Sequence, residues 1–327
     1  MTDKIRWGIL STGNIAHQFA RGLSALPDAE LVAVGSRSQE SAGAFADEFN
    51  IPRRYTNYEA LAADPDVDVI YIGTPHPYHA ENALLCLNAG KPVLCEKPFA
   101  LNARQAETVI RRARESGLFL MEAMWTRFTP VFTKVRELIA AGTIGEIRML
   151  TADFGFRADF DPAHRLFAPE LGGGALLDVG IYPVALASML FGQPAAIASQ
   201  VTLGQTGVDE QSAIVFKYDG GQLALLSTAI RTETPQEACI MGTKGMIRIP
   251  PSWWMPQKFS LRLQDEAEQV FDLPFEGNGY NYEAAEVMRC LRAGLLESLV
   301  MPLDETLATM HTLDAIRAQW GLVYPGE

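Results

Sequence analysis

The sequence is poor in cysteine, and its histidines and cysteines do not form the clusters that metal sites require. Its cysteines are Cys86, Cys95, Cys239 and Cys290. None of them has the C-x-x-C spacing of a zinc or redox motif, so we expect reduced thiols in a cytoplasmic protein. His76 and His79 have a spacing that could suit a metal, but no cysteine or carboxylate cluster lies beside them. We therefore predict no metal site.

The chain also lacks a long uninterrupted apolar run. Charged residues, Asp3, Lys4 and Arg6 among them, break the N-terminal segment, so that it does not resemble a signal peptide. The longest apolar stretch, residues 181–191, contains Pro183 and is shorter than the ~20 residues that cross a bilayer. We expect no interaction with a membrane.

Positive charge is scarce as well. The 327 residues include 27 Lys and Arg against 39 Asp and Glu, which gives a formal net charge of −12 at pH 7. A protein that binds the phosphate backbone of nucleic acid needs a basic face, so we expect no nucleic-acid partner. The length is sufficient for one large or two ordinary globular domains.

Strand and helix patterns alternate through the first third of the chain. The apolar strand patterns cover residues 5–10, 31–35, 69–73, 92–95 and 119–121. Helical patterns separate them, and parallel neighbours in a sheet need such crossover connections. We therefore predict an α/β fold that begins with a doubly wound parallel sheet of the Rossmann type.

The pattern changes after residue 121. Alternating segments joined by hairpin signals follow at residues 212–218, 223–230, 238–241 and 246–249. These segments predict an α+β domain with a mainly antiparallel, open sheet, and helices near 282–293 and 303–320 close the chain. We predict a dinucleotide-binding domain over residues 1–122 and a substrate domain over residues 123–327.

The turn after the first strand partly matches the dinucleotide fingerprint G-x-G-x-x-G/A. Ser11 stands at the first glycine position, Gly13 at the second and Ala16 at the third. The N–H groups at the start of the following helix could hold a pyrophosphate, although an ordinary strand–turn–helix has the same pattern. The predicted pyrophosphate-binding residues are Ser11, Thr12, Gly13, Asn14 and Ile15.

The end of the second strand lacks the acidic residue that NAD-binding folds use for the ribose 2′-hydroxyl. Ser36 and Arg37 stand there instead, at about the expected 20-residue distance. Arg37 can pair with a 2′-phosphate, so we predict NADP as the cofactor, with a solvated loop arginine as the alternative. The proline-rich turn at 74–79 follows the third strand, and we assign Thr74, Pro75 and His79 to the same cofactor.

Three separated motifs give the chain a family resemblance. They are Glu96-Lys97-Pro98, the segment 122–128 and the segment 172–182. With these motifs in this order, the chain resembles the Gfo/Idh/MocA family of nicotinamide oxidoreductases over essentially its whole length. The resemblance implies a Rossmann domain followed by an α/β domain whose open sheet mediates dimerisation, and hence a homodimer or higher homo-oligomer. Tyr182, where many sugar-oxidising members have histidine, resembles the branch of dimeric dihydrodiol dehydrogenases and NADP-dependent pentose dehydrogenases.

The resemblance and the residue chemistry together indicate a catalytic group of Lys97, Tyr182 and Asp178. Lys97 ends a parallel strand, and Asp178 and Tyr182 share one helix face. Tyr182 would accept the proton of a substrate hydroxyl, with Lys97 favouring the phenolate. Asp178 either binds a second hydroxyl or is itself the base; an N-cap aspartate with a core tyrosine is the structural alternative. The resemblance also places Glu96, Lys97 and Arg165 at the cofactor.

Aromatic residues complete the predicted site. We assign Trp125, Phe154 and Trp254 to substrate binding, and an apolar wall would favour a cyclic or aromatic diol. The sequence thus predicts an NADP-dependent oxidoreductase that interconverts a secondary alcohol and a ketone or lactone on a small diol or sugar. The alternative is a non-catalytic NADP(H)-binding sensor or regulator of the same fold, which would have no need of the catalytic group.

Overall fold

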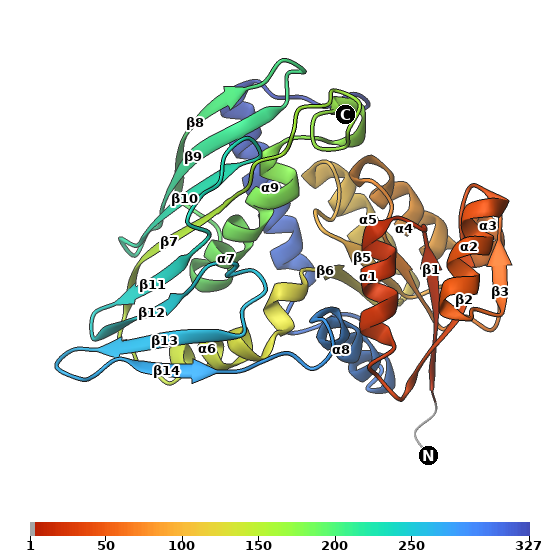
Figure 1. The fold of residues 1–327 in the computed structure, drawn as a ribbon, viewed down its shortest axis with the longest axis horizontal. Coiled ribbons are helices and arrows are strands. Elements are labelled where there is room, and N and C mark those ends of the chain that lie inside the picture. The colour runs from red at the N-terminus through yellow and green to blue at the C-terminus, as the bar shows by residue number, and fades with distance from the viewer. Residues whose placement is uncertain (1–3) are drawn as a thin grey trace. The chain divides into compact units, whose positions relative to one another are not determined.

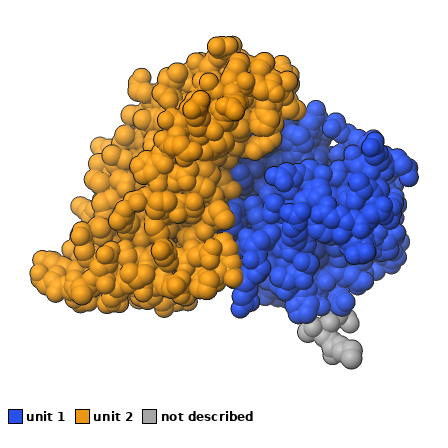
Figure 2. Space-filling view, in the orientation of Figure 1, with its two compact units in different colours: residues 1–100, 104–128, 276–306 blue, residues 101–103, 129–275, 307–327 orange. Residues whose placement is uncertain are grey.

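The computed structural model describes residues 4–327 and contains two compact units (Figures 1 and 2). Unit 1 comprises residues 1–100, 104–128 and 276–306, and unit 2 comprises residues 101–103, 129–275 and 307–327. The predicted domain boundary between residues 122 and 123 stays a prediction. In the structure, residues 276–306, which lie in the predicted second domain, belong to unit 1. The predicted absence of a signal peptide rests partly on residues 1–3, which lie outside the described residues.

Unit 1 is built on a six-stranded sheet in the order β3-β2-β1-β4-β5-β6. Its strands are β1 (Ile5–Leu10), β2 (Ala29–Gly35), β3 (Arg53–Tyr55), β4 (Val69–Ile72), β5 (Val93–Glu96) and β6 (Leu120–Ala123). All its neighbouring strands are parallel. This is the order of a doubly wound dinucleotide-binding fold, so the Rossmann prediction is confirmed.

Helices connect these strands, and local capping residues fix where several of them begin. They are α1 (Asn14–Leu23), α2 (Gln39–Phe49), α3 (Tyr58–Ala62), η1 (His76–Tyr78), α4 (His79–Asn88), α5 (Ala103–Ser116), η2 (Trp125–Phe128) and α8 (Tyr280–Arg292). Ser38 and Asn57 cap α2 and α3 through their side-chain oxygens. Helix α8 packs against α1, where an added Cβ at Gly22 would lie 2.9 Å from the Cβ of Tyr280.

Unit 2 contains an eight-stranded sheet in the order β14-β13-β12-β11-β7-β10-β9-β8. Its strands are β7 (Ile147–Gly155), β8 (Ala196–Leu203), β9 (Asp209–Lys217), β10 (Leu223–Ala229), β11 (Ala238–Gly242), β12 (Gly245–Ile249), β13 (Lys258–Leu263) and β14 (Gln269–Asp272). Only β7 and β10 pair in parallel. The predicted mainly antiparallel sheet is therefore confirmed.

The helices of unit 2 lie on one face of this sheet, and the other face carries no helix in Figure 1. They are α6 (Pro130–Ala140), η3 (Pro169–Leu171), η4 (Leu176–Gly180), α7 (Ile181–Phe191) and the part of α9 (Leu303–Trp320) from residue 307 onward. The segment η4 is π-helical. Pro183 explains the wider turn, because a proline clashes with the carbonyl group four residues before it, here that of Val179.

One helical run among residues 4–327, Pro169–Phe191, is long and apolar enough to cross a membrane by length and composition. It is longer than the 181–191 stretch considered from the sequence, because η4 continues directly into α7 and η3 precedes it across the glycine turn at residues 172–174. However, 83% of its apolar window is buried inside the protein. The run is therefore a core helix of unit 2.

Candidate functional site

Ser11 adopts the backbone conformation of the glycine that it replaces. Its φ is 115°, a value at which glycine is favoured. Its N–H donates to Gly35 O at 2.9 Å, and its Oγ accepts the N–H of Gly13 at 3.2 Å. The turn thus keeps the fingerprint geometry with a serine, and the hydroxyl supplies a local hydrogen bond that a glycine would lack.

Gly13 leaves room in front of helix α1. Its φ is −74°, and an added Cβ would come no closer than 3.6 Å to Ser11 Oγ, so the turn itself does not require glycine. No side chain caps α1 at this position. The absence of a side chain therefore fits the close approach of a ligand phosphate to the first-turn N–H groups. His17, which the sequence did not single out, holds the Gly13 carbonyl through Nδ1 at 2.9 Å.

The predicted 2′-phosphate residues lie beside this turn. Thr12 Oγ1 is 3.3 Å from Ser36 Oγ, which links the turn to the end of β2. Arg37 is exposed, and its guanidinium carbon lies 6.0 Å from the ring centroid of Tyr78. Burial raises the pKa of Tyr58, and a hydrogen bond from Arg37 opposes this rise. Two tyrosines, Tyr58 and Tyr78, thus lie beside Arg37. Their positions in the sequence did not predict this arrangement.

His79 does not present its ring to a cofactor. The side chain is fully buried, with Nδ1 2.8 Å from Pro98 O and Nε2 2.7 Å from Thr74 O. Burial lowers the pKa of His79. The predicted direct contact is therefore replaced by a positioning role, in which the imidazole ties the loop after β4 to the loop after β5. The predicted residues Thr74 and Pro75 lie on the first of these loops.

Glu96 is likewise committed within the protein. Its buried carboxylate accepts the Tyr71 hydroxyl at 2.6 Å and the backbone N–H of Lys97 at 3.2 Å. Burial raises the pKa of Glu96, and the positive charge of Lys97 opposes that rise. We therefore correct its assignment from cofactor binding to holding the backbone at Lys97. The Lys97 side chain is half-buried at the end of β5, and the Lys97–Pro98 peptide is cis.

Glu283 is a neighbour of this group that the sequence analysis missed. It lies on α8 with no exposed surface, and neither carboxyl oxygen has a hydrogen-bond partner among the described residues. Burial, together with the nearby Glu96, raises the pKa of Glu283 well above its usual value, because both disfavour the ionised carboxylate. A glutamate among the apolar positions of a helix, here beside Ala284 and Val287, was the available signal.

Unit 2 brings Asp178 and Arg165 together. Asp178 Oδ1 lies 2.5 Å from Arg165 Nη1, and the carboxylate is buried while the arginine is half exposed. Tyr182 also acts electrostatically on Arg165, so the predicted pair does lie around one guanidinium. Asp178 belongs to the π-helical η4 and Tyr182 to α7, rather than both to a regular α-helix. Arg165, which was predicted to lie at the cofactor, thus forms an ion pair with the predicted catalytic residue Asp178.

Two of the three predicted substrate residues meet in unit 2. Phe154 stacks on Trp254 with ring centroids 3.4 Å apart, and Tyr182 lies 5.5 Å from the same phenyl ring. Trp253 instead points into the core, where its Nε1 donates to Asp153 O at 2.7 Å. The third predicted residue, Trp125, lies in unit 1 and stacks on Tyr280, with ring centroids 4.6 Å apart.

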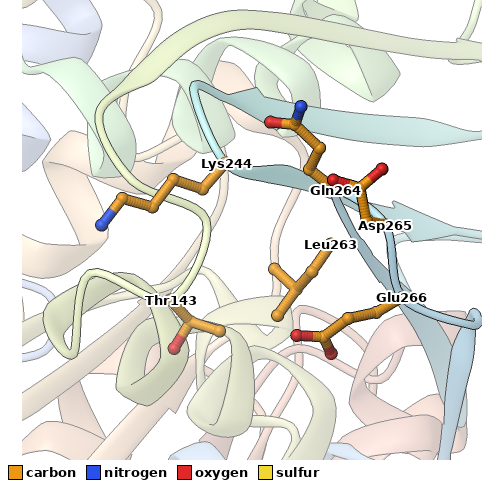
Figure 3. Close-up of a pocket in the computed structure, with 6 residues that line it drawn as sticks. All are labelled: Thr143, Lys244, Leu263, Gln264, Asp265 and Glu266. Carbon is orange, nitrogen blue, oxygen red and sulfur yellow. The ribbon is translucent and has the colours of Figure 1, made fainter.

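A separate hollow of about 400 Å³ lies beside β12 and β13 of unit 2 (Figure 3). Its lining residues are Thr143, Lys244, Leu263, Gln264, Asp265 and Glu266. In Figure 3 the Lys244 side chain extends away from the two acidic side chains. None of the predicted site residues lines this hollow, so it has no part in the predicted chemistry.

Known proteins resemble the chain along nearly all of its length. The trans-1,2-dihydrobenzene-1,2-diol dehydrogenase of Xenopus tropicalis is 41% identical, over 98% of this chain and 99% of the relative, and that of Mus musculus is 42% identical, over 99% of each. The 3-ketoreductase KijD10 from Actinomadura kijaniata, solved with NADP and TDP-benzene, superposes with a TM-score of 0.86 at 26% identity and covers 97% of this chain and 98% of its own.

A lower identity, 24%, relates the chain to the aldose-aldose oxidoreductase of Caulobacter crescentus, whose TM-score of 0.88 shows a shared fold over 98% of this chain and 99% of that one. Two family models match as well. An oxidoreductase family with an NAD-binding Rossmann fold matches residues 5–124, and the GFO/IDH/MocA C-terminal domain matches residues 132–248. The resemblance seen in the sequence motifs is thereby confirmed, and the chain belongs to the Gfo/Idh/MocA oxidoreductase family.

Proposed function

We propose that the protein is an NADP-dependent dehydrogenase that oxidises a secondary alcohol of a small diol, with trans-1,2-dihydrobenzene-1,2-diol as the first substrate to test. The observation that carries the proposal is the 38–42% identity, over nearly the whole chain, to relatives named for that reaction. The chain also carries Lys97, Asp178 and Tyr182, for which a pure nucleotide sensor has no need.

NADP is the proposed cofactor. Support comes from the exposed Arg37 with its two tyrosines, from Ser36 in place of an acid, and from the uncapped start of α1 behind Gly13. The similar 3-ketoreductase was solved with NADP. When bound, NADP⁺ would supply the acceptor for the hydride of the alcohol carbon. The residues of this chain then have to orient the diol and remove the hydroxyl proton.

We assign the proton transfer to Tyr182. Its hydroxyl would take the proton of the substrate alcohol, and the ammonium of Lys97 would favour the negative charge that develops. Asp178, held by Arg165 at 2.5 Å, would accept a hydrogen bond from the second hydroxyl of the diol. The stacked rings of Phe154 and Trp254 offer a flat apolar surface that suits the unsaturated ring of a dihydrodiol.

The exposed sheet face of unit 2 supports a homodimer. Val215 and Leu225 lie opposite each other on β9 and β10, 41% and 42% exposed, and Thr151 continues the row on β7. An apolar row on a sheet face without helices suits a second copy of the chain. Val215→Asp is expected to give monomers in analytical ultracentrifugation, whereas Leu299→Asp, at a more exposed apolar position, is expected to leave the dimer intact.

We also propose a cytoplasmic location without nucleic-acid or membrane partners. All four cysteines are unpaired thiols, as expected in a reducing compartment. The net charge of −12 disfavours a polyanion partner. Detection of the protein in the soluble fraction of fractionated cells, with the buried thiols of Cys86, Cys95 and Cys290 reactive only after unfolding, is the expected result. A protein found in an oxidising compartment would overturn this assignment.

The deciding experiment for the activity follows NADPH formation against trans-1,2-dihydrobenzene-1,2-diol, cyclic diols, pentoses and hexoses. We expect the dihydrodiol to give the highest kcat/KM, and NADP⁺ to be preferred over NAD⁺. Tight NADPH binding without reduction across the whole panel would instead support the sensor alternative. A preference for NAD⁺ would overturn the role given to Arg37 while leaving the dehydrogenase assignment intact.

A further inference from the structure

We propose that Asp209, which no sequence motif singled out, is the positioning residue that fixes the start of the helix carrying Asp178 and Tyr182. The proposal rests on the proposed function for its catalytic consequence, but its structural content can be tested without activity. Asp209 is the first residue of β9, 33 residues after the helix start that it contacts, and its side chain has no exposed surface.

The contact itself is a helix cap made by a distant strand. Asp209 Oδ2 accepts the backbone N–H of Leu176 at 2.6 Å, and Leu176 is the first residue of η4. Helix starts leave N–H groups without partners, and a carboxylate there satisfies one of them and interacts favourably with the helix dipole. The usual local N-cap residue is replaced here by Ala175, which has no side-chain acceptor.

The glycine run before the helix is explained by the same contact. Gly174 has φ 114°, and an added Cβ would lie 2.2 Å from Asp209 Oδ1. An added Cβ at Gly173 would lie 2.9 Å from the carbonyl oxygens of Arg165 and Leu166. The glycines therefore let the chain pass directly against the buried carboxylate and against the loop that carries Arg165.

A second buried residue, Tyr324, holds the glycine run just before the helix. The Tyr324 hydroxyl donates to Gly173 O at 2.6 Å and would lie 3.3 Å from a Cβ at Gly174. Arg317 packs over the Tyr324 ring, with its guanidinium carbon 5.1 Å from the centroid, and pairs with Glu327 at 2.8 Å. The start of the helix is thus held between β9 and the chain that follows α9.

This placement matters because only one residue, Leu177, lies between Leu176 and Asp178, and one further turn leads to Tyr182. A helix whose first N–H is fixed has a fixed rotation, so the cap sets the direction of Asp178 toward Arg165 and of Tyr182 toward Phe154. Displacements of about 1 Å at reacting groups can cost ~100-fold in rate. Asp209 thus acts through the helix, without contact to the substrate.

Charges that face the carboxylate are few. Burial raises the pKa of Asp209 to about 7, while the Leu176 and Ala175 backbone groups and the charge of Arg317 oppose the rise. The other titratable group against it is the Tyr324 phenol, whose pKa burial raises well above its usual value. The cap therefore loses its negative charge as the pH falls through about 7, which predicts a decline of kcat over that range.

The test compares Asp209→Ala and Asp209→Asn with Asp219→Asn, a matched change in the exposed β9–β10 turn. We expect Asp209→Ala to lower kcat about 100-fold with KM for NADP unchanged. Hydrogen–deuterium exchange should accelerate in residues 174–182. Asparagine keeps an acceptor oxygen but carries no charge, so the kcat of Asp209→Asn should exceed that of Asp209→Ala, match that of the protonated wild type below pH 7, and show no dependence on pH near 7. Asp219→Asn should behave as the wild type.

Tyr324→Phe serves if Asp209→Ala does not fold, because it removes one hydroxyl and leaves the carboxylate in place. Faster exchange confined to the same segment supports the proposal. Wild-type exchange and kcat in folded Asp209→Ala, or in both Asp209→Asn and Tyr324→Phe, would overturn it. If the wild type oxidises no diol at all, the proposed function fails, whereas the exchange result still decides whether Asp209 holds the helix.

Discussion

The two units hold their predicted site residues in different ways. In unit 1, Ser11 and Lys97 follow parallel strands, and their positions are set by the register of the sheet and by short backbone contacts. In unit 2, Asp178 and Tyr182 lie on a helix whose start is held by Asp209, a residue from a distant strand. A strand end is placed by its neighbours in the sheet, whereas this helix start depends on long-range hydrogen bonds from the Asp209 and Tyr324 side chains.

Both units contain buried acidic residues next to their predicted site residues, but the carboxyl groups have different surroundings in the two units. Glu96 accepts two hydrogen bonds beside Lys97, whereas neither carboxyl oxygen of Glu283 has a hydrogen-bond partner among the described residues, and burial raises the pKa of Glu283 well above its usual value. Asp209 accepts backbone hydrogen bonds at the start of η4, and burial raises its pKa to about 7. Unit 1 thus places two buried acids close together, whereas the Asp209 carboxyl of unit 2 is held by backbone N–H groups.

The largest effect is expected from Lys97→Met in unit 1. Removing the ammonium should lower kcat by about 10³-fold or more, within the range given by acid–base groups, because Lys97 is the group assigned to stabilise the developing phenolate while Arg165 is paired with Asp178. NADPH binding, measured by fluorescence titration, should change little. A kcat within a factor of a few of the wild type would remove Lys97 from the mechanism and leave catalysis to unit 2.

Within unit 2, Tyr182→Phe and Asp178→Asn separate the two candidate bases. We expect Tyr182→Phe to lower kcat by about 10²–10³-fold and Asp178→Asn to act mainly on KM for the diol, since the Asp178 carboxylate is engaged by Arg165. Steady-state kinetics of both variants decide the matter. Near-normal turnover in Tyr182→Phe together with its loss in Asp178→Asn would exchange the two roles.

The buried acids predict a pH dependence of stability that differs between variants of the two units. Burial raises the pKa of Asp209 in unit 2 and of Glu122 in unit 1 to about 7 each, so both bind protons more tightly in the folded protein. For these two groups, the free energy of unfolding should therefore be highest below about pH 4. It should fall as the pH rises from about 4 to about 7. Each group is expected to contribute on the order of 3 kcal/mol to this fall.

Urea unfolding of Asp209→Asn and Glu122→Gln between pH 5 and 8 measures these contributions. Each variant should lose part of the decline and be more stable than the wild type at pH 8, because a buried charge is no longer formed. Equal slopes in the wild type and Asp209→Asn would mean that the carboxyl ionises at its ordinary pKa, and the same comparison for Glu122→Gln tests unit 1 independently.

A smaller effect is expected from Arg37→Ala at the cofactor end of unit 1. Loss of one charge-assisted contact should weaken NADP⁺ binding by about 10-fold and leave NAD⁺ binding unchanged. Isothermal titration with both nucleotides gives the comparison, and Arg54→Ala, which breaks a surface ion pair with Asp47, is the matched control. An equal loss for both nucleotides would contradict recognition of a 2′-phosphate.

These contrasts also explain what the sequence could predict. Strand order, the glycine turn and the Glu96-Lys97-Pro98 strand end could be recognised because each depends on neighbours in sequence or on the register of a parallel sheet. The burial of His79 and Glu96 could not, because it depends on carbonyl and hydroxyl groups up to 25 residues away that complete their hydrogen bonds. Asp209 and Glu283 escaped for the same reason, since their partners are brought to them only by folding.

The smallest expected effect concerns Ser11. Ser11 in unit 1 and Gly174 in unit 2 have nearly the same φ, so the two positions can be compared. Ser11 tolerates a Cβ at 115°, whereas Gly174 at 114° does not, because a Cβ there would meet Asp209 Oδ1 at 2.2 Å. Backbone conformation alone therefore does not demand glycine. Ser11→Ala keeps the strain and loses the bond to Gly13, and should cost about 1 kcal/mol. Ser11→Gly loses the same bond but relieves strain of about 1–2 kcal/mol, so it should lie within about 1 kcal/mol of the wild type. Urea unfolding should accordingly rank Ser11→Gly above Ser11→Ala; the reverse order would mean that the strain relieved at residue 11 is smaller than the effect of the freedom that glycine adds to the unfolded chain.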